Sequence, residues 1–463
     1  MIQIKLNREQ FYLIALYLIS VFCVLFFPST VAVVVSIGFV LVAIVFEHNS
    51  YQRGNTYVST IILLFPIILS VFQNIYIGLA SERIDSSDLQ VLLSLHFLLF
   101  SFVAFLGMKR DFRKMGWVFL LIGILLLFAI PLYFKNPTNM VALLSSVRNV
   151  LSCMLLYCFG CVLSKKADQN LFFKYIIILS WFVVLFGLME WLSGNAIWKS
   201  LGITKLWSLK GISTNEYGVP VNWYSSEIIG GRTLRRMASS FADPVNLGTF
   251  LFAAFMIAWY KREKILMSAL LICMILTMSK GALLGLLVFI VVVMWEKKGS
   301  RSITPLIIAL VILFSGWFIG FSKSSSTGSL MVHLNGFLNA LRGFVDHPFG
   351  FGLGNVGVLA RVLGSTMVGN GVVETGIGMI IAQLGIVGII VYGVFFAKLW
   401  TEPLKWNGFH GRERTLYYSL LISFIANAMF NEVALSPNSC GLYFISLAYL
   451  NSKICNLENK TFS

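Results

Sequence analysis

The chain has 463 residues, of which 58% are apolar and only 12% are charged, and its mean hydropathy is +0.85. Soluble domains carry about 25% charged residues, and disordered segments have low hydrophobicity, so the composition excludes both classes. The formal net charge is +16, but in so apolar a chain an excess of Lys and Arg is typical of cytoplasmic loops and does not indicate binding to nucleic acid. We therefore expect an all-α polytopic membrane protein.

Apolar runs long enough to cross a bilayer recur along the whole chain. A spanning helix needs about 20 mainly apolar residues, and about fourteen segments approach this pattern. The expected spans are residues 10–27, 30–46, 57–80, 90–107, 117–134, 146–163, 172–192, 243–260, 264–279, 281–295, 303–321, 374–399, 415–430 and 439–450. They divide the chain into N-terminal transmembrane helices (1–171), a core (172–400) and C-terminal helices with a tail (401–463).

Short clusters of positive charge indicate the orientation of these spans. With the N-terminus inside, the cytoplasmic segments hold most of the 35 Lys and Arg residues, as the positive-inside rule requires. The basic stretch 108–116 falls inside, whereas the acidic stretch 82–88 falls outside. No small-residue cleavage site follows the first apolar run, so we expect a retained helix there and not a signal peptide. Both termini are then expected in the cytoplasm.

Two segments on the outer side are much longer than the other connections, residues 193–242 and 322–373. The first is rich in Trp and Tyr, including Trp198, Trp207 and Trp223, which favours a partly ordered cap at the membrane surface. Long ordered loops on a helical scaffold are where binding and chemistry usually concentrate. We therefore expect the functional site between these two loops.

Three arginines close the first loop, on the side where positive charge is normally scarce: Arg232, Arg235 and Arg236. They either reach toward lipid headgroups or form an anion clamp, because Arg offers paired donors that match phosphate oxygens. Lys280 occupies a short outer turn among small residues. It is either an interface anchor or a second phosphate ligand.

The second loop contains a segment with helical periodicity. Its apolar residues recur at helical spacing from Leu330 to Val345, while Arg342 falls on the opposite face, so we expect an amphipathic helix along the membrane surface or against the bundle. His333 lies at the border of the apolar face, away from Arg342. His333, Arg342 and the following His347 are candidate contacts for substrate.

Glu374 begins a long apolar run. A carboxylate at the top of a spanning helix is either a partner for the helix dipole or a functional group such as a general base. The preceding Gly350, Gly352 and Gly354 have no strand before them, so they do not match a dinucleotide-binding motif. A tight turn that re-enters the membrane fits them better.

Several of these motifs, in this order, resemble one family. It is the O-antigen polymerase (Wzy) and O-antigen ligase-like superfamily of integral membrane glycosyltransferases, and the likeness covers roughly residues 180–400. The matching motifs are the run from Arg236 to Leu247, Ser279-Lys280-Gly281-Ala282, Gly328-Ser329 with His333-Leu334-Asn335-Gly336, Gly352-Leu353-Gly354-Asn355-Val356-Gly357, and Glu374 followed by Gln383-Leu384-Gly385.

The resemblance implies a location and a chemistry. Members lie in the bacterial inner membrane and transfer a glycan from undecaprenyl diphosphate to an acceptor hydroxyl at the periplasmic face, without a cofactor or a metal. Arg235, Arg236 and Lys280 would then stabilise the departing diphosphate, with Arg232, Arg342 and His347 as further substrate contacts. Glu374 or His333 would serve as the base, with Glu374 the preferred choice and His333 positioning the acceptor.

The implied partners are the undecaprenyl diphosphate-linked oligosaccharide, the bilayer and a Wzz-type chain-length co-polymerase. Two departures from the family pattern matter: Lys280 stands where Arg is frequent, and Asn370-Gly371 stands where many ligases carry a histidine. The pattern therefore favours a polymerase over a ligase that transfers polymer to lipid A-core. A flippase or transporter of lipid-linked oligosaccharide is the alternative from another class.

The charge pattern predicts the sidedness of four segments. Single cysteines placed in 193–242 and 322–373 of a cysteine-free chain are expected to react with an impermeant thiol reagent added to cells. Cysteines in 108–116 and 400–414 are expected to stay unmodified until the membrane is opened. Labelling of 400–414 in intact cells would contradict the expected orientation.

Overall fold

The computed structural model describes residues 56–86, 88–89, 93, 97, 101, 104, 112–164, 167–229, 232–298, 329–357, 360, 373–405 and 411–461. The long helices are α3 (Thr56–Ala80), α5 (Phe112–Lys135), α6 (Met140–Ser164), α7 (Gln169–Leu192), α10 (Pro244–Lys261), α11 (Lys264–Thr277), α12 (Lys280–Lys298), α14 (Ser329–Asp346), α16 (Gly376–Thr401), α17 (Arg412–Ala428) and α18 (Pro437–Thr461). Every expected span that falls wholly in the described residues coincides with one of these helices. The expected spans 10–27, 30–46 and 303–321, and most of 90–107, lie outside them.

Five helices in the described part of the chain are long and apolar enough to cross a membrane: α3, α5, α6, α7 and α16. Their outward side chains are apolar, as Leu127 and Phe134 of α5 illustrate with 74% and 79% exposure. In water such side chains would be costly, whereas lipid solvates them. The chain is therefore a helical, multi-pass type of membrane protein.

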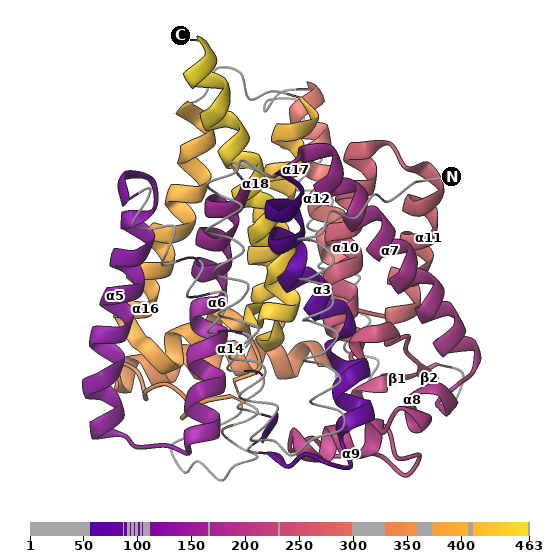
Figure 1. Ribbon diagram of the computed structural model, residues 1–463. Helices are drawn as coiled ribbons and strands as arrows, with labels where there is room; N and C mark the ends of the chain where they lie inside the picture. The colour runs from indigo at the N-terminus through magenta and orange to yellow at the C-terminus, as the bar shows by residue number, and fades with distance from the viewer. Residues whose placement is uncertain are drawn as a thin grey trace.

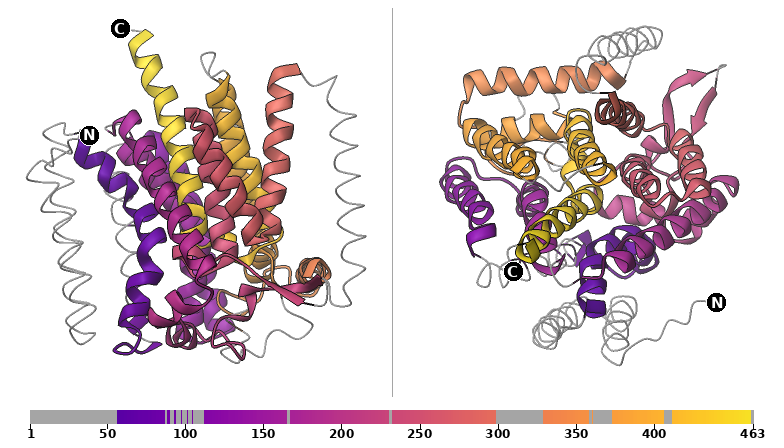
Figure 2. Two further views of the ribbon diagram at one scale, coloured as in Figure 1. Left: turned by 90° about the vertical axis from the view of Figure 1, so that its right-hand side faces the viewer. Right: turned by 90° about the horizontal axis from the view of Figure 1, so that it is seen from above.

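The helices form one bundle with a continuous apolar core (Figure 1). The C-terminal helix α18 lies in the middle of this bundle, where it packs along α6 and also contacts α3, α10 and α17. Figure 2 shows the same helices side by side from two further directions. Helices from the beginning and the end of the sequence thus share one core.

The two long loops gather at the same end of the bundle, the lower end in Figure 1. Helix α14 runs across the bundle axis there and packs against α16. Val345 on α14 is 78% exposed, so this helix covers the bundle with one side and presents apolar residues with another. The amphipathic helix expected within 322–373 is confirmed, and the turn between α10 and α11 lies at the opposite end.

The loop 193–242 is an ordered cap. It contains α8 (Ala196–Ser200), α9 (Ile203–Leu209), η1 (Val221–Trp223), an antiparallel hairpin of β1 (Tyr224–Ile229) and β2 (Arg232–Arg235), and η2 (Ser239–Phe241). The hairpin was not expected from the sequence. Trp198 and Trp223 are fully buried, and their indole N–H groups donate to the carbonyls of Ser239 and Ala242, each at 3.0 Å. Trp223 is therefore a core residue of the cap.

Helix α16 is interrupted in its middle, at Gly385, where the backbone has φ 56° and ψ −138°. The glycine turn at 350–354 lies against this break. The amides of Phe351 and Gly352 donate to the carbonyls of Ala382 and Gln383 at 2.8 and 3.0 Å, and the amide of Ile386 donates to Pro348 at 2.9 Å. Backbone groups inside a membrane protein need such partners. The turn therefore supplies hydrogen-bond partners to the backbone groups of α16 that the break leaves unpaired within the helix.

We expect Gly385→Ala to destabilise the protein. A Cβ at this position would lie 2.1 Å from the carbonyl oxygen of Pro348, and the positive φ also disfavours any side chain. Together these effects should cost roughly 1–3 kcal/mol or more. Gly393→Ala is the matched control, because it lies in the same helix and a Cβ there meets nothing within 4 Å. Thermal unfolding in detergent should show a lower midpoint for Gly385→Ala only, and equal midpoints would contradict this account.

Candidate functional site

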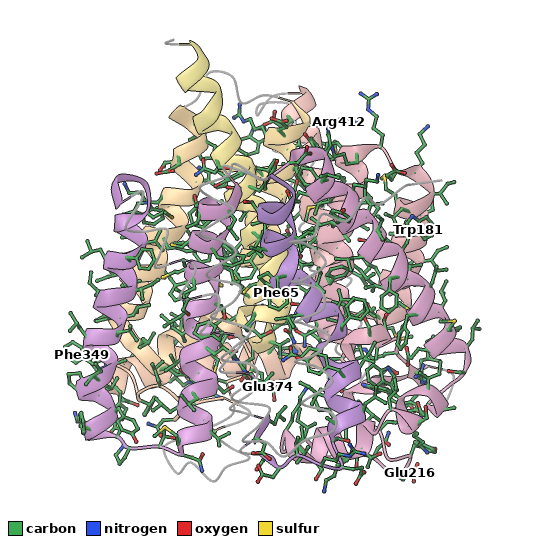
Figure 3. All side chains as sticks on the ribbon, viewed as in Figure 1. Phe65, Trp181, Glu216, Phe349, Glu374 and Arg412 are labelled. Atoms are coloured by element: carbon green, nitrogen blue, oxygen red, sulfur yellow. The ribbon has the colours of Figure 1, made fainter. Side chains whose placement is uncertain are left out.

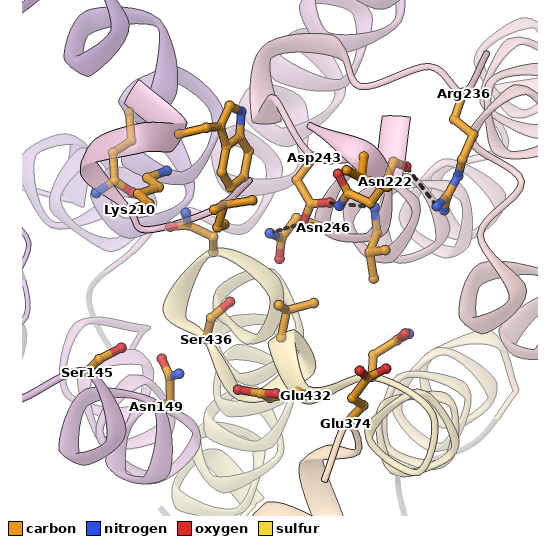
Figure 4. Close-up of a pocket in the computed structure, with 18 of the residues that line it drawn as sticks. Ser145, Asn149, Lys210, Asn222, Arg236, Asp243, Asn246, Glu374, Glu432 and Ser436 are labelled. Atoms are coloured by element: carbon orange, nitrogen blue, oxygen red, sulfur yellow. Dashed lines mark hydrogen bonds between the residues drawn. The ribbon is translucent and has the colours of Figure 1, made fainter. Parts of the chain in front are cut away.

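A cavity of about 1180 Å³ opens at the end of the bundle that carries the cap and α14. Its walls come from α3, α6, the cap, the start of α10, α14 and the connection between α17 and α18 (Figure 4). Figure 3 shows Glu374 in the lower half of the bundle and Glu216 near its lower edge, while Arg412 lies at the opposite end. The ionisable residues of the wall are Arg148, Lys210, Glu216, Arg236, Asp243, His333, Glu374 and Glu432.

His333 and Glu374 meet in this cavity. The Nδ1 atom of His333 lies 4.0 Å from Oε2 of Glu374, and the two side chains keep 22% and 30% of their surface exposed. The packing of α14 on α16 brings them together, since Glu374 directly precedes Thr375, the N-cap of α16. The two candidate bases are therefore neighbours and not alternatives in separate places.

The surroundings of His333 keep its imidazole neutral. Burial lowers the pKa of His333 below its usual value, and the positive charge of Lys280 lowers it further, although Glu374 acts in the opposite direction. A neutral imidazole has a nitrogen that can accept a proton or a hydrogen bond. Its Nδ1 accepts no hydrogen bond from the described residues.

Arg236 is held at the cavity wall by backbone carbonyls. Its Nε donates to Thr277 at 2.7 Å and its Nη1 donates to Asn222 at 3.0 Å. Carbonyl partners fix the direction of the guanidinium without neutralising its charge. Arg236 lines the cavity, where its positive charge also acts on the carboxylate of Asp243.

Arg235 points away from the cavity, although it directly precedes Arg236 in the sequence. It forms an ion pair with Glu190 of α7, and its Nε donates to Asn195 at 2.9 Å. Glu190 is fully buried, and its second oxygen accepts from the amides of Ala238 and Ser239 at 3.2 and 3.1 Å. Arg235 is not part of the cavity wall, and its charge is matched by that of Glu190.

Arg342 and His347 also lie outside the wall. Arg232 pairs through its backbone with Ile229 in the hairpin, and its side chain lies outside the described residues. Arg342 and His347 are exposed, and the ring of His347 packs against Phe351 with centroids 4.5 Å apart.

Lys280 begins α12 and is half-buried; it acts on His333 electrostatically but does not line the cavity. A Cβ on the adjacent Gly281 would lie 2.0 Å from Oδ1 of Asn427. The close approach that the small residues around Lys280 permit is therefore made by α17.

Several residues of the wall were missed by the sequence reasoning. Arg148 stood out as a charge inside the expected span 146–163, and intramembrane charge is a signal of function by itself. Asp243 caps α10 by accepting from the amides of Val245 and Asn246, and it also accepts from Asn222 at 3.0 Å. Lys210 lies in a loop with many other charges, and nothing in the local sequence distinguishes it.

Comparison with known proteins adds no relative. No family model matches the chain, and no curated protein matches it either. The chemistry of the site is therefore inferred from its own residues.

We expect the Arg235–Glu190 pair to act in stability. Removing one partner of a buried ion pair leaves an uncompensated charge and typically costs about 3–5 kcal/mol, so Arg235→Met should lower the unfolding midpoint strongly. Adding Glu190→Gln should restore part of it, because the amide oxygen can still accept from Ala238 and Ser239 without a charge. Arg342→Met, at an exposed position, is the control. A wild-type midpoint for Arg235→Met would refute this role.

Proposed function

We propose that the protein is a polysaccharide polymerase that transfers a growing glycan from undecaprenyl diphosphate to the acceptor hydroxyl of another lipid-linked repeat unit at the periplasmic face. The observation that carries the proposal is the gathering of Arg236, His333 and Glu374 in one cavity, from three distant segments of the chain. These are the groups that such a transfer needs, one for the departing diphosphate and two near the attacking hydroxyl.

In this reaction the acceptor oxygen forms a bond to the anomeric carbon while the bond from that carbon to the diphosphate breaks. The hydroxyl proton passes to Glu374, with the neutral His333 holding the acceptor in place. The electron pair of the broken bond leaves with the diphosphate, whose growing charge Arg236 stabilises. No other co-reactant is required for atoms and charges to balance.

The remaining wall suits sugars. Aromatic side chains and amides alternate around the cavity, among them Trp207, Tyr217, Tyr224, Asn215 and Asn222. Aromatic rings pack on the apolar faces of sugar rings, and amides bond their hydroxyls in both directions. The volume of about 1180 Å³ exceeds the usual 300–1,000 Å³ of small-ligand pockets, which leaves room for several sugar rings.

Two features favour transport as the second candidate. Transporters place charged residues and interrupted helices at their substrate sites, and this chain has Arg148 in α6 and the break at Gly385 in α16. The cavity lies at one end of the bundle and beneath an ordered cap, which is the arrangement that chemistry at one membrane face requires. A ligase would use the same groups with a different acceptor.

The purified full chain, mixed in detergent with lipid-linked repeat units, separates these functions. A polymerase is expected to produce a ladder of longer lipid-linked glycans without any co-polymerase, although the ladder would be unregulated in length. Extension only when lipid A-core is supplied would indicate a ligase. No extension in detergent, together with movement of the lipid-linked unit across intact vesicles, would indicate a transporter.

Variants in the same assay test the assigned roles. Glu374→Gln should lower the rate by about 10²–10⁴, the usual contribution of a general base, and His333→Gln should be less impaired and mainly raise KM for the acceptor.

Because the pKa of His333 is lowered, its imidazole stays neutral at neutral and alkaline pH. Protonation of His333 should therefore cause no loss of activity when the rate is measured from neutral pH upward.

Arg342→Gln, outside the wall, is the control for the Glu374→Gln and His333→Gln variants. A near-normal rate in Glu374→Gln, with activity lost in His333→Gln, would reverse the assignment.

A further inference from the structure

A second group of positive charges lines the cavity, apart from Arg236. Figure 4 shows Lys210 and Arg236 on opposite sides of the set formed by Asp243, Asn222 and Asn246. Ser145 and Asn149, which flank Arg148 in α6, lie on the side of Lys210. Both Arg148 and Lys210 belong to the cavity wall, and the proposed transfer reaction assigns no role to either.

The guanidinium of Arg148 has few hydrogen-bond partners. Its Nη2 lies 3.5 Å from Oγ of Ser145, and its Nε has no hydrogen-bond partner among the described residues. A guanidinium carries five N–H donors, and a buried donor such as Nε that lacks a partner is costly. An oxyanion in the cavity would supply the missing acceptors in the paired geometry that Arg favours.

The direct contacts of Lys210 are also neutral groups. Its Nζ donates to Oδ1 of Asn74 at 2.8 Å and lies 4.8 Å from the ring centre of Trp207, and both partners are neutral. Burial lowers the pKa of Lys210 to about 8, with the charge of Arg148 adding to this effect and that of Asp243 opposing it. The two cations are therefore close enough to repel each other. Within the described part of the chain neither forms an ion pair with a carboxylate.

The acid that attracts Lys210 is Asp243, and Arg236 acts on the same carboxylate, so one negative charge is shared between two cations. Asp243 accepts hydrogen bonds from Asn222 and Asn246 and from two amides at the start of α10. Two like charges held together in a partly dry wall destabilise the empty protein, and an anion between them reverses this. Two cations in one cavity wall are therefore suited to binding an anion.

We infer that Arg148 and Lys210 form a second anion subsite, distinct from Arg236, which binds a phosphate or carboxylate group of the substrate. Under the proposed function, on which the meaning of this subsite rests, two sources supply such a group. One is the diphosphate of the second lipid-linked chain, and the other is an acidic sugar within the repeat unit. Both present oxyanions that an Arg and a Lys recognise.

The test measures binding and needs no catalysis. Isothermal titration of inorganic pyrophosphate and of glucuronate into the purified full chain is performed in an Arg236→Gln background, which removes the first anion ligand. Pyrophosphate should still bind. Adding Lys210→Met or Arg148→Gln should weaken binding at least tenfold, whereas Lys210→Arg should retain it because the charge remains. Lys205→Met, which removes an exposed cation from the same helix α9, is the matched control and should change nothing.

The two probes distinguish the sources. Glucuronate that competes with pyrophosphate would assign the subsite to an acidic sugar, and pyrophosphate binding alone would assign it to a carrier diphosphate. The inference is overturned if neither probe binds the Arg236→Gln protein, or if binding persists undiminished when Lys210→Met is added. Chain extension without this anion binding would contradict the proposed subsite and support the polymerase function. Anion binding without chain extension would support the subsite and contradict the polymerase function.

Discussion

The rest of the site depends on one buried carboxylate, that of Glu190. Its two oxygens bind Arg235 and the amides of Ala238 and Ser239, so the chain between the hairpin and α10 follows a single course. Adjacent residues at the end of a strand point to opposite sides. Because Arg235 is drawn inward to Glu190, Arg236 faces the cavity. The direction in which Arg236 points is therefore set by an ion pair that lies outside the cavity wall.

Neutral groups make many of the direct contacts to the charged residues of the cavity. Arg236 is fixed by neutral carbonyls, Lys210 by the amide of Asn74, and His333 stands 4.0 Å from Glu374. Asp243 also acts on both Arg236 and Lys210 through its charge. Neutral partners hold each charged group in place while its field still acts across the cavity, and this preorganisation is what stabilises charge that moves during a reaction.

Periodicity and apolar runs predicted the helices well, because a spanning helix is a local property of about 20 residues. The amphipathic pattern predicted α14, and the motifs around His333 and Glu374 selected residues that do meet. The partners of Arg235 and Trp223, which are Glu190 and Ala242, could not be predicted, because they lie at sequence separations on which local spacing carries no information. The position of Arg148 within an expected span is a sequence signal for a functional residue, which the arginines of the first loop do not provide.

The break in α16 also bears on how the protein is assembled. The carbonyls opened around Gly385 are covered by residues 348–352, which precede α16 in the chain and so leave the ribosome first. A spanning segment with open backbone groups is unfavourable in lipid, but here the covering turn is already present when the segment is inserted. The hydrogen bonds at the break in α16 therefore depend on residues that are synthesised before it, and not on α17 or α18.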